Sequence, residues 1–264
     1  MKKLLAGLLL VSSVLSFGAQ RVPIEKLVGN GDGKLLYLEG EQKPYSGEVE
    51  RKYPNGKLLG VATMKDGKLN GKAYEYYENG KVFREEVYVN GEANGPAKSY
   101  YENGQVEYET NFKNSQREGI EKGYSKSGVL VSEVPFKNDA ATGLAKLYNE
   151  QTGKLEYETV YVDNMREGLS KKYYPSGKLE SEENYKNGYE EGINTIYYEN
   201  GNIEYEKYVS NNGRLVYEKH FYPNGQIDFE ATYKDGQLDG VVKKYGENGQ
   251  VVQQGTFKNG VQVK

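Results

Sequence analysis

The sequence repeats itself every 24 residues, and this period constrains the fold more than any other feature. A short motif, written Tyr-Tyr-Glu-Asn-Gly at residues 76–80, returns along the chain and closes on a glycine each time. These glycines are Gly56, Gly80, Gly104, Gly128, Gly153, Gly177, Gly201, Gly225 and Gly249. Seven of the intervals between them are 24 residues long and one is 25. A period this strict predicts a repeat array rather than a domain with one central core.

Each repeat contains two turn signals separated by short runs typical of strands. The first is the glycine motif, and the second is a pair such as Asn90-Gly91 or Asn187-Gly188. Two turns in 24 residues leave strands of about six to eight residues, which predicts one β-hairpin per repeat. No window has a sustained helical period. We therefore expect an all-β fold, an elongated, solenoid-like twisted sheet of about nine tandem hairpins.

Prolines before the first turn indicate its type. Pro54, Pro175 and Pro223 precede the turn residues, which favours a three-residue loop, a type I turn followed by glycine in the left-handed region. This loop places Tyr76 opposite Val82 and Tyr173 opposite Leu179. Tyr100 opposite Val106 and Tyr197 opposite Ile203 follow in the same way.

Strict alternation from these pairs predicts one apolar face, which we expect to be the core. It contains Ile120, Leu169, Ile193, Val241, Tyr108, Tyr157, Tyr205, Phe229, Tyr88, Phe112, Phe136, Tyr161, Tyr185, Tyr233 and Phe257. The opposite face contains a tyrosine column and a glutamate column. These are Tyr53, Tyr77, Tyr101, Tyr174, Tyr198 and Tyr222, with Glu85, Glu109, Glu133, Glu158, Glu182, Glu206 and Glu230.

Two explanations of these columns remain open. They form a solvated sheet face, with tyrosines covering the strands and glutamates paired to lysines, or they are displayed to a partner. In the second case the best binding patch lies in repeats 6 to 8. Its residues are Tyr174, Tyr198, Tyr222, Glu182, Glu206 and Glu230. The acidic column favours a basic or hydroxyl-rich ligand and disfavours anionic lipid.

The two ends of the array differ from the repeats. A basic start and an apolar run from Leu4 to Leu15 predict a signal peptide over residues 1–19, too short for an ordinary membrane span. Residues 20–46 are predicted to form a degenerate half-repeat that caps the array. Asn30-Gly31-Asp32-Gly33 within it is a turn cluster, with a calcium loop as the weaker alternative. Residues 47–264 hold the nine repeats.

Catalytic chemistry finds little support in the composition. The chain has no cysteine and only one histidine, His220, expected on the polar face beside Tyr222. It contains neither a nucleophile elbow nor a phosphate-binding loop. The net charge of −3 becomes −5 without Lys2 and Lys3, which does not suit nucleic acid. We expect no enzyme activity, no metal and no cofactor.

The repeat motif resembles the bacterial variant of the MORN repeat. Residues 174–188 carry its pattern in Tyr174, Gly177, Lys178, Leu179, Glu182, Tyr185, Lys186, Asn187 and Gly188. The resemblance implies elongated hairpin sheets that bind proteins or lipid head groups, and similar chains are grouped with YwqK-type antitoxins. Repeat 4 departs at Ser125 and Ser127, repeat 5 by one inserted residue between Asn149 and Gly153, and repeat 9 at Gly246 and Gln254.

The sequence therefore predicts a non-enzymatic, exported repeat scaffold, located in the periplasm, at the cell surface or outside the cell. Its expected partner is a protein or a surface glycan, with lipid head groups as a weaker option. No transmembrane span is expected after cleavage of the signal peptide. The alternative is an antitoxin or immunity protein that binds a single toxin.

Overall fold

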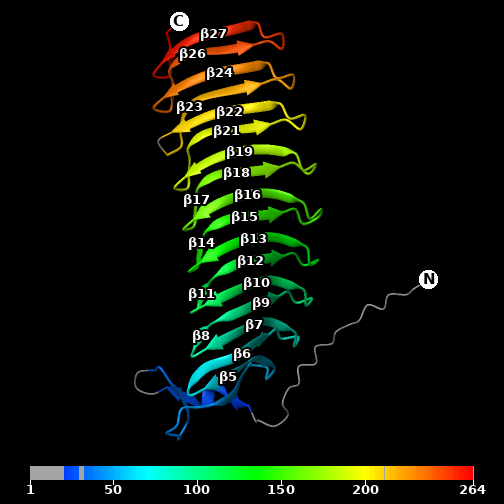
Figure 1. Ribbon diagram of the computed structural model, residues 1–264, viewed down its shortest axis with the longest axis vertical. Coiled ribbons are helices and arrows are strands. Elements are labelled where there is room, and N and C mark those ends of the chain that lie inside the picture. Colours follow the sequence, from blue (N-terminus) through cyan, green and yellow to red (C-terminus); the bar gives the residue numbers. More distant parts are fainter. Residues whose placement is uncertain (1–20, 30–32, 211, 264) are drawn as a thin grey trace, which may run out of the picture.

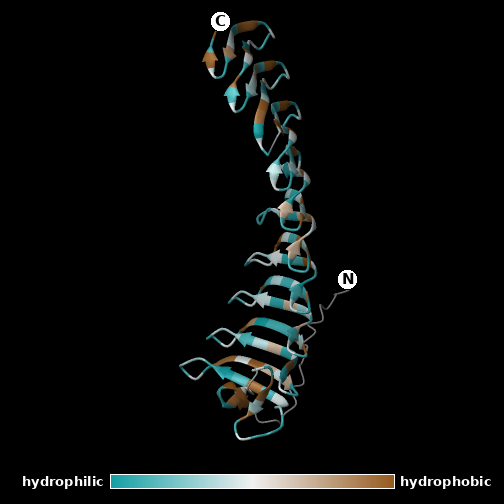
Figure 2. Cartoon of the chain, turned by 90° about the vertical axis from the view of Figure 1, so that its left-hand side faces the viewer, coloured by the Kyte–Doolittle hydropathy of each residue, from teal (hydrophilic) through white to brown (hydrophobic). Residues whose placement is uncertain are grey.

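The protein is one long, open β-sheet built from stacked hairpins. The computed structural model describes residues 21–29, 33–210 and 212–263, so the predicted signal peptide and most of the Asn30–Gly33 turn lie outside the described residues. The hairpins follow one another along the long axis, and the last repeat lies at the end opposite the leading segment (Figure 1). Seen from the side, most of the array is a single layer (Figure 2). The predicted all-β repeat fold is confirmed.

The nine hairpins of the described residues pair a first strand with a second strand. They are β4 (Gly47–Lys52) with β5 (Leu58–Lys65), β6 (Lys68–Tyr76) with β7 (Val82–Val89), β9 (Gly95–Tyr100) with β10 (Val106–Lys113), β12 (Gly119–Tyr124) with β13 (Leu130–Lys137), β15 (Gly143–Tyr148) with β16 (Leu155–Val162), β18 (Gly168–Tyr173) with β19 (Leu179–Lys186), β21 (Gly192–Tyr197) with β22 (Ile203–Ser210), β23 (Arg214–Phe221) with β24 (Ile227–Lys234) and β26 (Gly240–Tyr245) with β27 (Val251–Lys258).

Short strands follow several second turns and pair antiparallel with the end of the preceding second strand. They are β8 (Glu92–Ala93), β11 (Gln116–Arg117), β14 (Ala140–Ala141), β17 (Met165–Arg166), β20 (Tyr189–Glu190), β25 (Gln237–Leu238) and β28 (Val261–Gln262). Outside repeat 7, where Ser210 pairs with Arg214, the second turns are two-residue turns in which both residues have positive φ, as in Asn90-Gly91 with φ of 53° and 92°. This is the type I′ geometry that suits a tight hairpin.

The first turn has the predicted three-residue form. In repeat 2 the amide of Tyr77 donates to the carbonyl of Lys81, and the amide of Gly80 donates back to Tyr77. All nine predicted turn glycines have a positive φ, between 67° and 94°. Repeat 5 has a longer loop, closed by Asn149 and Lys154, because of its inserted residue.

A β-bulge follows every first turn, and it changes which residues share a face. Tyr173 pairs with Leu179 as predicted, but Lys172 then pairs with Ser181, so Glu180 is an extra residue. The same shift occurs in all nine hairpins. One extra residue reverses the alternation along the rest of the second strand. Strict alternation therefore predicted the wrong faces for these segments.

We name the two faces by their recurrent residues. The glutamate face carries Glu85, Glu109, Glu133, Glu158, Glu182, Glu206 and Glu230 on the same side as Tyr76, Tyr100 and Tyr173. The alanine face carries Ala73, Ala97 and Ala145, with Ser170 and Asn194 at equivalent positions.

The predicted core face is wrong because it mixes these two sides. Its second-strand aromatics lie on the alanine face: Tyr88, Tyr108, Phe112, Phe136, Tyr157, Tyr161, Tyr185, Tyr205, Phe229, Tyr233 and Phe257. Its first-strand aliphatics Ile120, Leu169, Ile193 and Val241 lie on the glutamate face and are exposed.

Small side chains make up much of the buried set, and most of these lie on the alanine face. Ala97, Ala145, Thr159, Ser170 and Ala231 are all almost fully buried. A single-layer sheet has no second layer to cover a large side chain, so full burial is easiest for residues shielded by longer neighbours. Val49, Met64, Tyr185 and Val209 are exceptions among the larger residues.

The leading segment closes one end of the sheet. Strand β1 (Val22–Pro23) pairs in parallel with β4, and a short 3-10 turn, η1 (Ile24–Lys26), follows it. Strands β2 (Leu27–Gly29) and β3 (Leu36–Leu38) form a separate two-stranded sheet. The amide of Leu36 donates to the carbonyl of Gly67, and the amide of Gly67 to that of Tyr45, which ties this segment to the first repeat.

We expect Gly177→Val to reduce the free energy of unfolding by about 1 to 3 kcal/mol, because a β-branched residue is strained in the left-handed region. Gly177 has a φ of 90°. Ser176→Val, at the exposed neighbour without positive φ, is the control. Hydrogen exchange should increase mainly in repeats 5 to 7, because contacts in an array join neighbours. Uniform loosening of all repeats would contradict this expectation.

Candidate functional site

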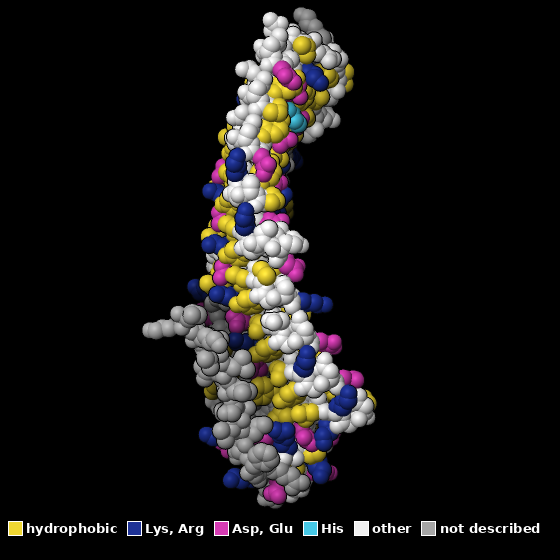
Figure 3. Space-filling model, turned by 90° about the vertical axis from the view of Figure 1, so that its right-hand side faces the viewer, with side chains coloured by type: hydrophobic (Ala, Val, Ile, Leu, Met, Phe, Trp, Pro, Cys, Tyr) yellow, Lys and Arg dark blue, Asp and Glu magenta, His cyan; other side chains and the backbone are white. Residues whose placement is uncertain are grey.

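The tyrosine column predicted as a binding ladder links each repeat to the next. The hydroxyl of Tyr198 donates to the backbone carbonyl of Phe221 at 2.7 Å, and Tyr174 donates to the carbonyl of Tyr197 at 2.5 Å. Tyr53, Tyr77, Tyr101 and Tyr222 make the same bond, 23 residues ahead. A band of hydrophobic-class side chains, tyrosine included, runs along the turn edge (Figure 3).

This ladder is interrupted in the middle of the array. Ser125 replaces the tyrosine in repeat 4, and its hydroxyl bonds that of Ser127 at 2.7 Å. Asn149 replaces it in repeat 5, and its side-chain oxygen accepts from the amides of Gln151 and Thr152. Both side chains form hydrogen bonds within their own turn, and the bond to the next repeat is not made at these two positions.

The glutamate column forms a second set of links between repeats. In repeats 3 to 7 and 9, the tyrosine that ends the first strand donates its hydroxyl to the glutamate of the preceding repeat, at distances from 2.6 to 3.1 Å. These pairs are Tyr100–Glu85, Tyr124–Glu109, Tyr148–Glu133, Tyr173–Glu158, Tyr197–Glu182 and Tyr245–Glu230. In repeat 8, Phe221 has no hydroxyl, and Tyr217 bonds Glu206 at 3.1 Å instead.

Lysines on the glutamate face complete these contacts. Lys98 lies 2.7 Å from Glu109, and Lys171 lies 3.5 Å from Glu182. The hydrogen bond from Lys98 is the main cause that lowers the pKa of Glu109. The hydrogen bond from Tyr245 is the main cause that lowers the pKa of Glu230. Exposed ion pairs contribute little stability, but each one neutralises a charge of the column.

The six residues of the predicted patch therefore do not form one cluster. Glu182 bonds Tyr197 and Glu230 bonds Tyr245, so each glutamate contacts a tyrosine outside the predicted set. Burial raises the pKa of the Tyr174 hydroxyl, and the nearby charge of Glu180 raises it further. Glu180 pairs with Lys172 on the alanine face, so Tyr174 lies toward that face and not toward Glu182. The two columns belong to different sides of the hairpins, and both make bonds within the chain.

An exposed apolar stripe on the glutamate face was missed because four of its five residues were assigned to the core and Leu144 was not considered. The apolar stripe consists of Ile120, Leu144, Leu169, Ile193 and Val241, each at the second position of a first strand. Their exposed fractions range from 37% to 57%. Val162, Met165 and Tyr189, also exposed, extend it toward the second turns of repeats 5 and 6.

The stripe is long and is bordered by charge. Strands lie about 4.8 Å apart and each repeat supplies two, so the stripe extends roughly 50 Å. In each hairpin of the stripe, the next residue pair on the glutamate face places a lysine or threonine opposite a glutamate or glutamine. Beside Leu169, for example, Lys171 lies opposite Glu182. An apolar line with a charged border is a surface suited to an amphipathic protein.

Other site chemistry is sparse in the part of the chain that the structure describes. His220 lies between Tyr205 and Phe229, with ring centroids 4.7 and 5.6 Å away, and 3.7 Å from Glu218. Among the described residues, no group of three or more histidine or acidic side chains is arranged to hold a metal ion. The same residues include no helix long and apolar enough to cross a membrane.

A comparison with family models matches the repeats. The model described as MORN repeat variant matches residues 45–66, 69–90, 93–114, 117–138, 166–187, 190–211, 215–235 and 238–259. The unmatched interval contains the repeat with the inserted residue. No curated protein matches the chain.

Solved structures resemble it only distantly. The chain is similar to the crystal structure of TcdB2-TccC3-TEV, with 12% identity over 84% of this chain and 13% of that one, and a TM-score of 0.20. It is similar to the Photorhabdus luminescens Tc holotoxin pore, with 12% identity over 84% of this chain and 16% of that one, and a TM-score of 0.19. The chain thus spans less than a fifth of these structures.

We expect Tyr198→Phe to reduce the free energy of unfolding by about 1 kcal/mol, because it removes the hydrogen bond to the Phe221 carbonyl. Tyr189→Phe is the control, because the Tyr189 side chain is exposed and makes no hydrogen bond within the described residues. Urea unfolding monitored by circular dichroism measures both. Equal effects of the two substitutions would show that the ladder adds no stability.

We expect several tyrosines of the folded chain to ionise late. Burial and the neighbouring glutamates raise the pKa of Tyr148, Tyr173 and Tyr233 to about 12. Because the folded pKa is raised, the stability these hydroxyls supply is fully present below pH about 10 and is lost as the pH rises toward 12. Ultraviolet titration measures this directly, since the chain has no tryptophan. Identical titration curves in water and in urea would contradict it.

Proposed function

Because the chain belongs to the MORN repeat variant family, we propose that it is an exported, non-catalytic scaffold that binds a protein partner along the apolar stripe. The family match supports a general role in binding and does not specify a partner. The observation that carries the finer proposal is the exposed stripe itself. Exposed apolar residues recur at one position of repeats 4 to 7 and of repeat 9, on a face that no other described element covers.

The partner follows from the chemistry of this face. Ile120, Leu144 and Ile193 offer apolar area, and the adjacent row offers paired lysines and glutamates. An amphipathic protein segment matches both, with apolar side chains on the stripe and polar ones on the row. The regular spacing suits a partner that is itself extended. Anionic lipid fits less well, because the face carries a glutamate in seven consecutive repeats.

Export and the absence of catalysis are part of the proposal. The basic and apolar start of the sequence supports export to the periplasm, the cell surface or the medium. Repeated geometry supports a binding role, because it places the same groups in every hairpin. An enzyme needs an asymmetric set of groups around one substrate.

We expect Leu144→Ser with Ile193→Ser to abolish capture of the partner from an envelope extract. The matched control is Leu147→Ser with Ile196→Ser. Those residues lie three positions further along the same two strands, on the alanine face, and are similarly exposed. Both double variants should stay folded by circular dichroism, because all four side chains are exposed.

The pattern of captured proteins separates the two functional hypotheses. Several envelope proteins, all lost in the Leu144/Ile193 variant, support the scaffold. One small partner in a one-to-one complex supports the antitoxin or immunity protein instead. Capture that is equal for wild type and both variants would remove the apolar stripe from the proposal.

A further inference from the structure

Side chains on the first turns bond one repeat to the next along one edge of the sheet (Figure 1). The tyrosine ladder is one such contact. A second contact, which we call the turn bond, comes from the lysine after the turn glycine or the asparagine before it. That side chain donates to a backbone carbonyl in the first turn of the next repeat. The donors are Lys57, Lys81, Asn103, Lys154, Lys178, Asn200 and Asn224, at distances from 2.6 to 3.2 Å.

The boundary between repeats 4 and 5 lacks both contacts. In repeat 4, Ser125 stands at the ladder position and Val129, which has no side-chain donor, stands at the lysine position. The hydroxyls of Ser125 and Ser127 bond each other, and the amide of Val129 donates to Ser125 at 3.2 Å. Among the described residues 33–210 and 212–263, no other boundary between neighbouring repeats lacks both a ladder bond and a turn bond.

The next boundary, between repeats 5 and 6, keeps contacts that the first one lacks. It also has no ladder tyrosine, but Lys154 donates to the carbonyl of Pro175 at 2.9 Å. On the alanine face, the buried hydroxyls of Thr159 and Ser170 bond each other across this boundary. The loss of the ladder is therefore offset between repeats 5 and 6.

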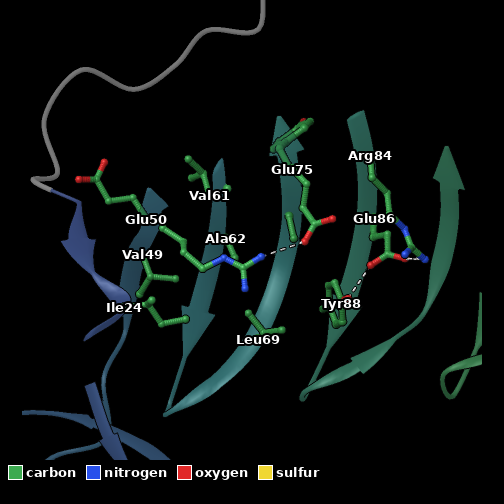
Figure 4. Close-up of a pocket in the computed structure, with 14 residues that line it drawn as sticks. Ile24, Val49, Glu50, Val61, Ala62, Leu69, Glu75, Arg84, Glu86 and Tyr88 are labelled. Atoms are coloured by element: carbon green, nitrogen blue, oxygen red, sulfur yellow. Dashed lines mark hydrogen bonds and ion pairs between the residues drawn. The ribbon is translucent and has the colours of Figure 1, made fainter. Parts of the chain in front are cut away.

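The boundary between repeats 1 and 2 shows how a fully linked pair of hairpins differs. On the alanine face, Arg51 of repeat 1 lies 3.4 Å from Glu75 of repeat 2 (Figure 4). At the first turns, Tyr53 supplies the ladder bond and Lys57 the turn bond. Side chains thus join these two hairpins on one face and along the first-turn edge together.

Backbone chemistry weakens the boundary between repeats 4 and 5 further. Pro135 lies within β13 and has no amide hydrogen. Its carbonyl accepts from the amide of Thr142, which leads into repeat 5, and the N–H and C=O of one strand residue point to the same side. The donor that proline lacks is therefore on the side of repeat 5. In repeat 6 the equivalent amide, on Asn184, donates to the side chain of Asn194 in repeat 7 at 2.6 Å.

The contacts that remain between repeats 4 and 5 hold the opposite edge and the glutamate face. At the second turns, the amide of Asn164 donates to the carbonyl of Ala141 at 3.0 Å, and the amide of Ala141 donates to the Asn164 side chain at 2.8 Å. On the glutamate face, Tyr148 donates to Glu133 at 2.8 Å. Strands β13 and β15 pair at two positions only. Opening therefore breaks the fewest contacts at the first-turn edge.

We propose that the boundary between repeats 4 and 5 is a hinge, at which the array opens along its first-turn edge and repeats 1–4 and 5–9 move as two segments. Local opening occurs where few contacts must break. The apolar stripe crosses this hinge from Ile120 to Leu144, and both residues lie close to the bonded second-turn edge. The stripe stays continuous when the hinge opens, so the array can follow the shape of a partner. The hinge itself does not depend on the proposed partner, because it follows from contacts within the chain alone.

Repeat 6 provides a matched comparison, because its first turn has the same length. Residues 174–178 are Tyr-Pro-Ser-Gly-Lys, and residues 125–129 are Ser-Lys-Ser-Gly-Val. Hydrogen exchange of the full chain, followed by mass spectrometry and corrected for intrinsic rates, measures opening at both. We expect residues 125–132 and 147–150 to exchange at least roughly tenfold faster than residues 174–181 and 196–199, because two hydrogen bonds are missing at the hinge.

Exchanging two residues between these turns tests the cause. Tyr174→Ser with Lys178→Val gives repeat 6 the two residues of repeat 4 and should create a second fast-exchanging boundary, between repeats 6 and 7. Ser125→Tyr with Val129→Lys is the converse change and should slow exchange at the hinge to the rate of the neighbouring boundaries. Ser125→Phe with Val129→Met is the matched control, because it adds similar bulk without a donor and should leave exchange at the hinge fast.

Folding of each variant is checked by circular dichroism, because Ser125 is almost fully buried. If the converse change does not fold, the Tyr174/Lys178 variant decides the test, since it removes side-chain atoms and adds none. The hinge is overturned if wild-type residues 125–132 exchange no faster than residues 174–181. It is equally overturned if the Tyr174/Lys178 variant leaves exchange between repeats 6 and 7 unchanged, or if the phenylalanine control slows the hinge as much as the converse change does.

Discussion

The limited backbone pairing between most neighbouring hairpins is the constraint on which the rest of this structure depends. The exceptions are repeats 1 and 2, which pair at five positions, and repeats 7 and 8, which pair at six. Strands β9 and β10 pair at six positions within their hairpin. Between β10 and the next hairpin there are two paired positions with β12 and two with the short strand β11. Side chains must therefore supply part of the contact between repeats. The tyrosine hydroxyls do so on one side of the first turn, and the tyrosine–glutamate pairs do so on the glutamate face.

This constraint explains why the most regular residues of the sequence contact the chain itself. A repeated tyrosine looks like a displayed binding ladder when only its period is known. In the structure each hydroxyl already has an acceptor in the next repeat, and a buried hydroxyl without one would cost stability. Strict repetition is thus first a requirement of stacking. Surface residues that take no part in contacts between repeats, such as those of the apolar stripe, are more informative about partners.

Much of the fold could be predicted from the sequence because period and turn chemistry are local signals. Glycine spacing gave the repeat, and Pro-Asn-Gly gave the three-residue loop, including the pairing of Tyr173 with Leu179. The bulge at Glu180 could not be predicted in this way. Its residue type varies from leucine to phenylalanine, glutamate, valine and aspartate in different repeats, so no side chain marks it. Missing that one residue reversed the faces of every second strand and hid the exposed position of Leu169.

The apolar stripe can be recognised in the sequence only once the faces are known, because Leu169 and its neighbour Ser170 lie on opposite faces. An array makes the same surface many times, which favours an extended partner and disfavours recognition of one small group. The stripe is suited to a long partner for this reason, since its residues recur at one position in repeats 4 to 7 and again in repeat 9.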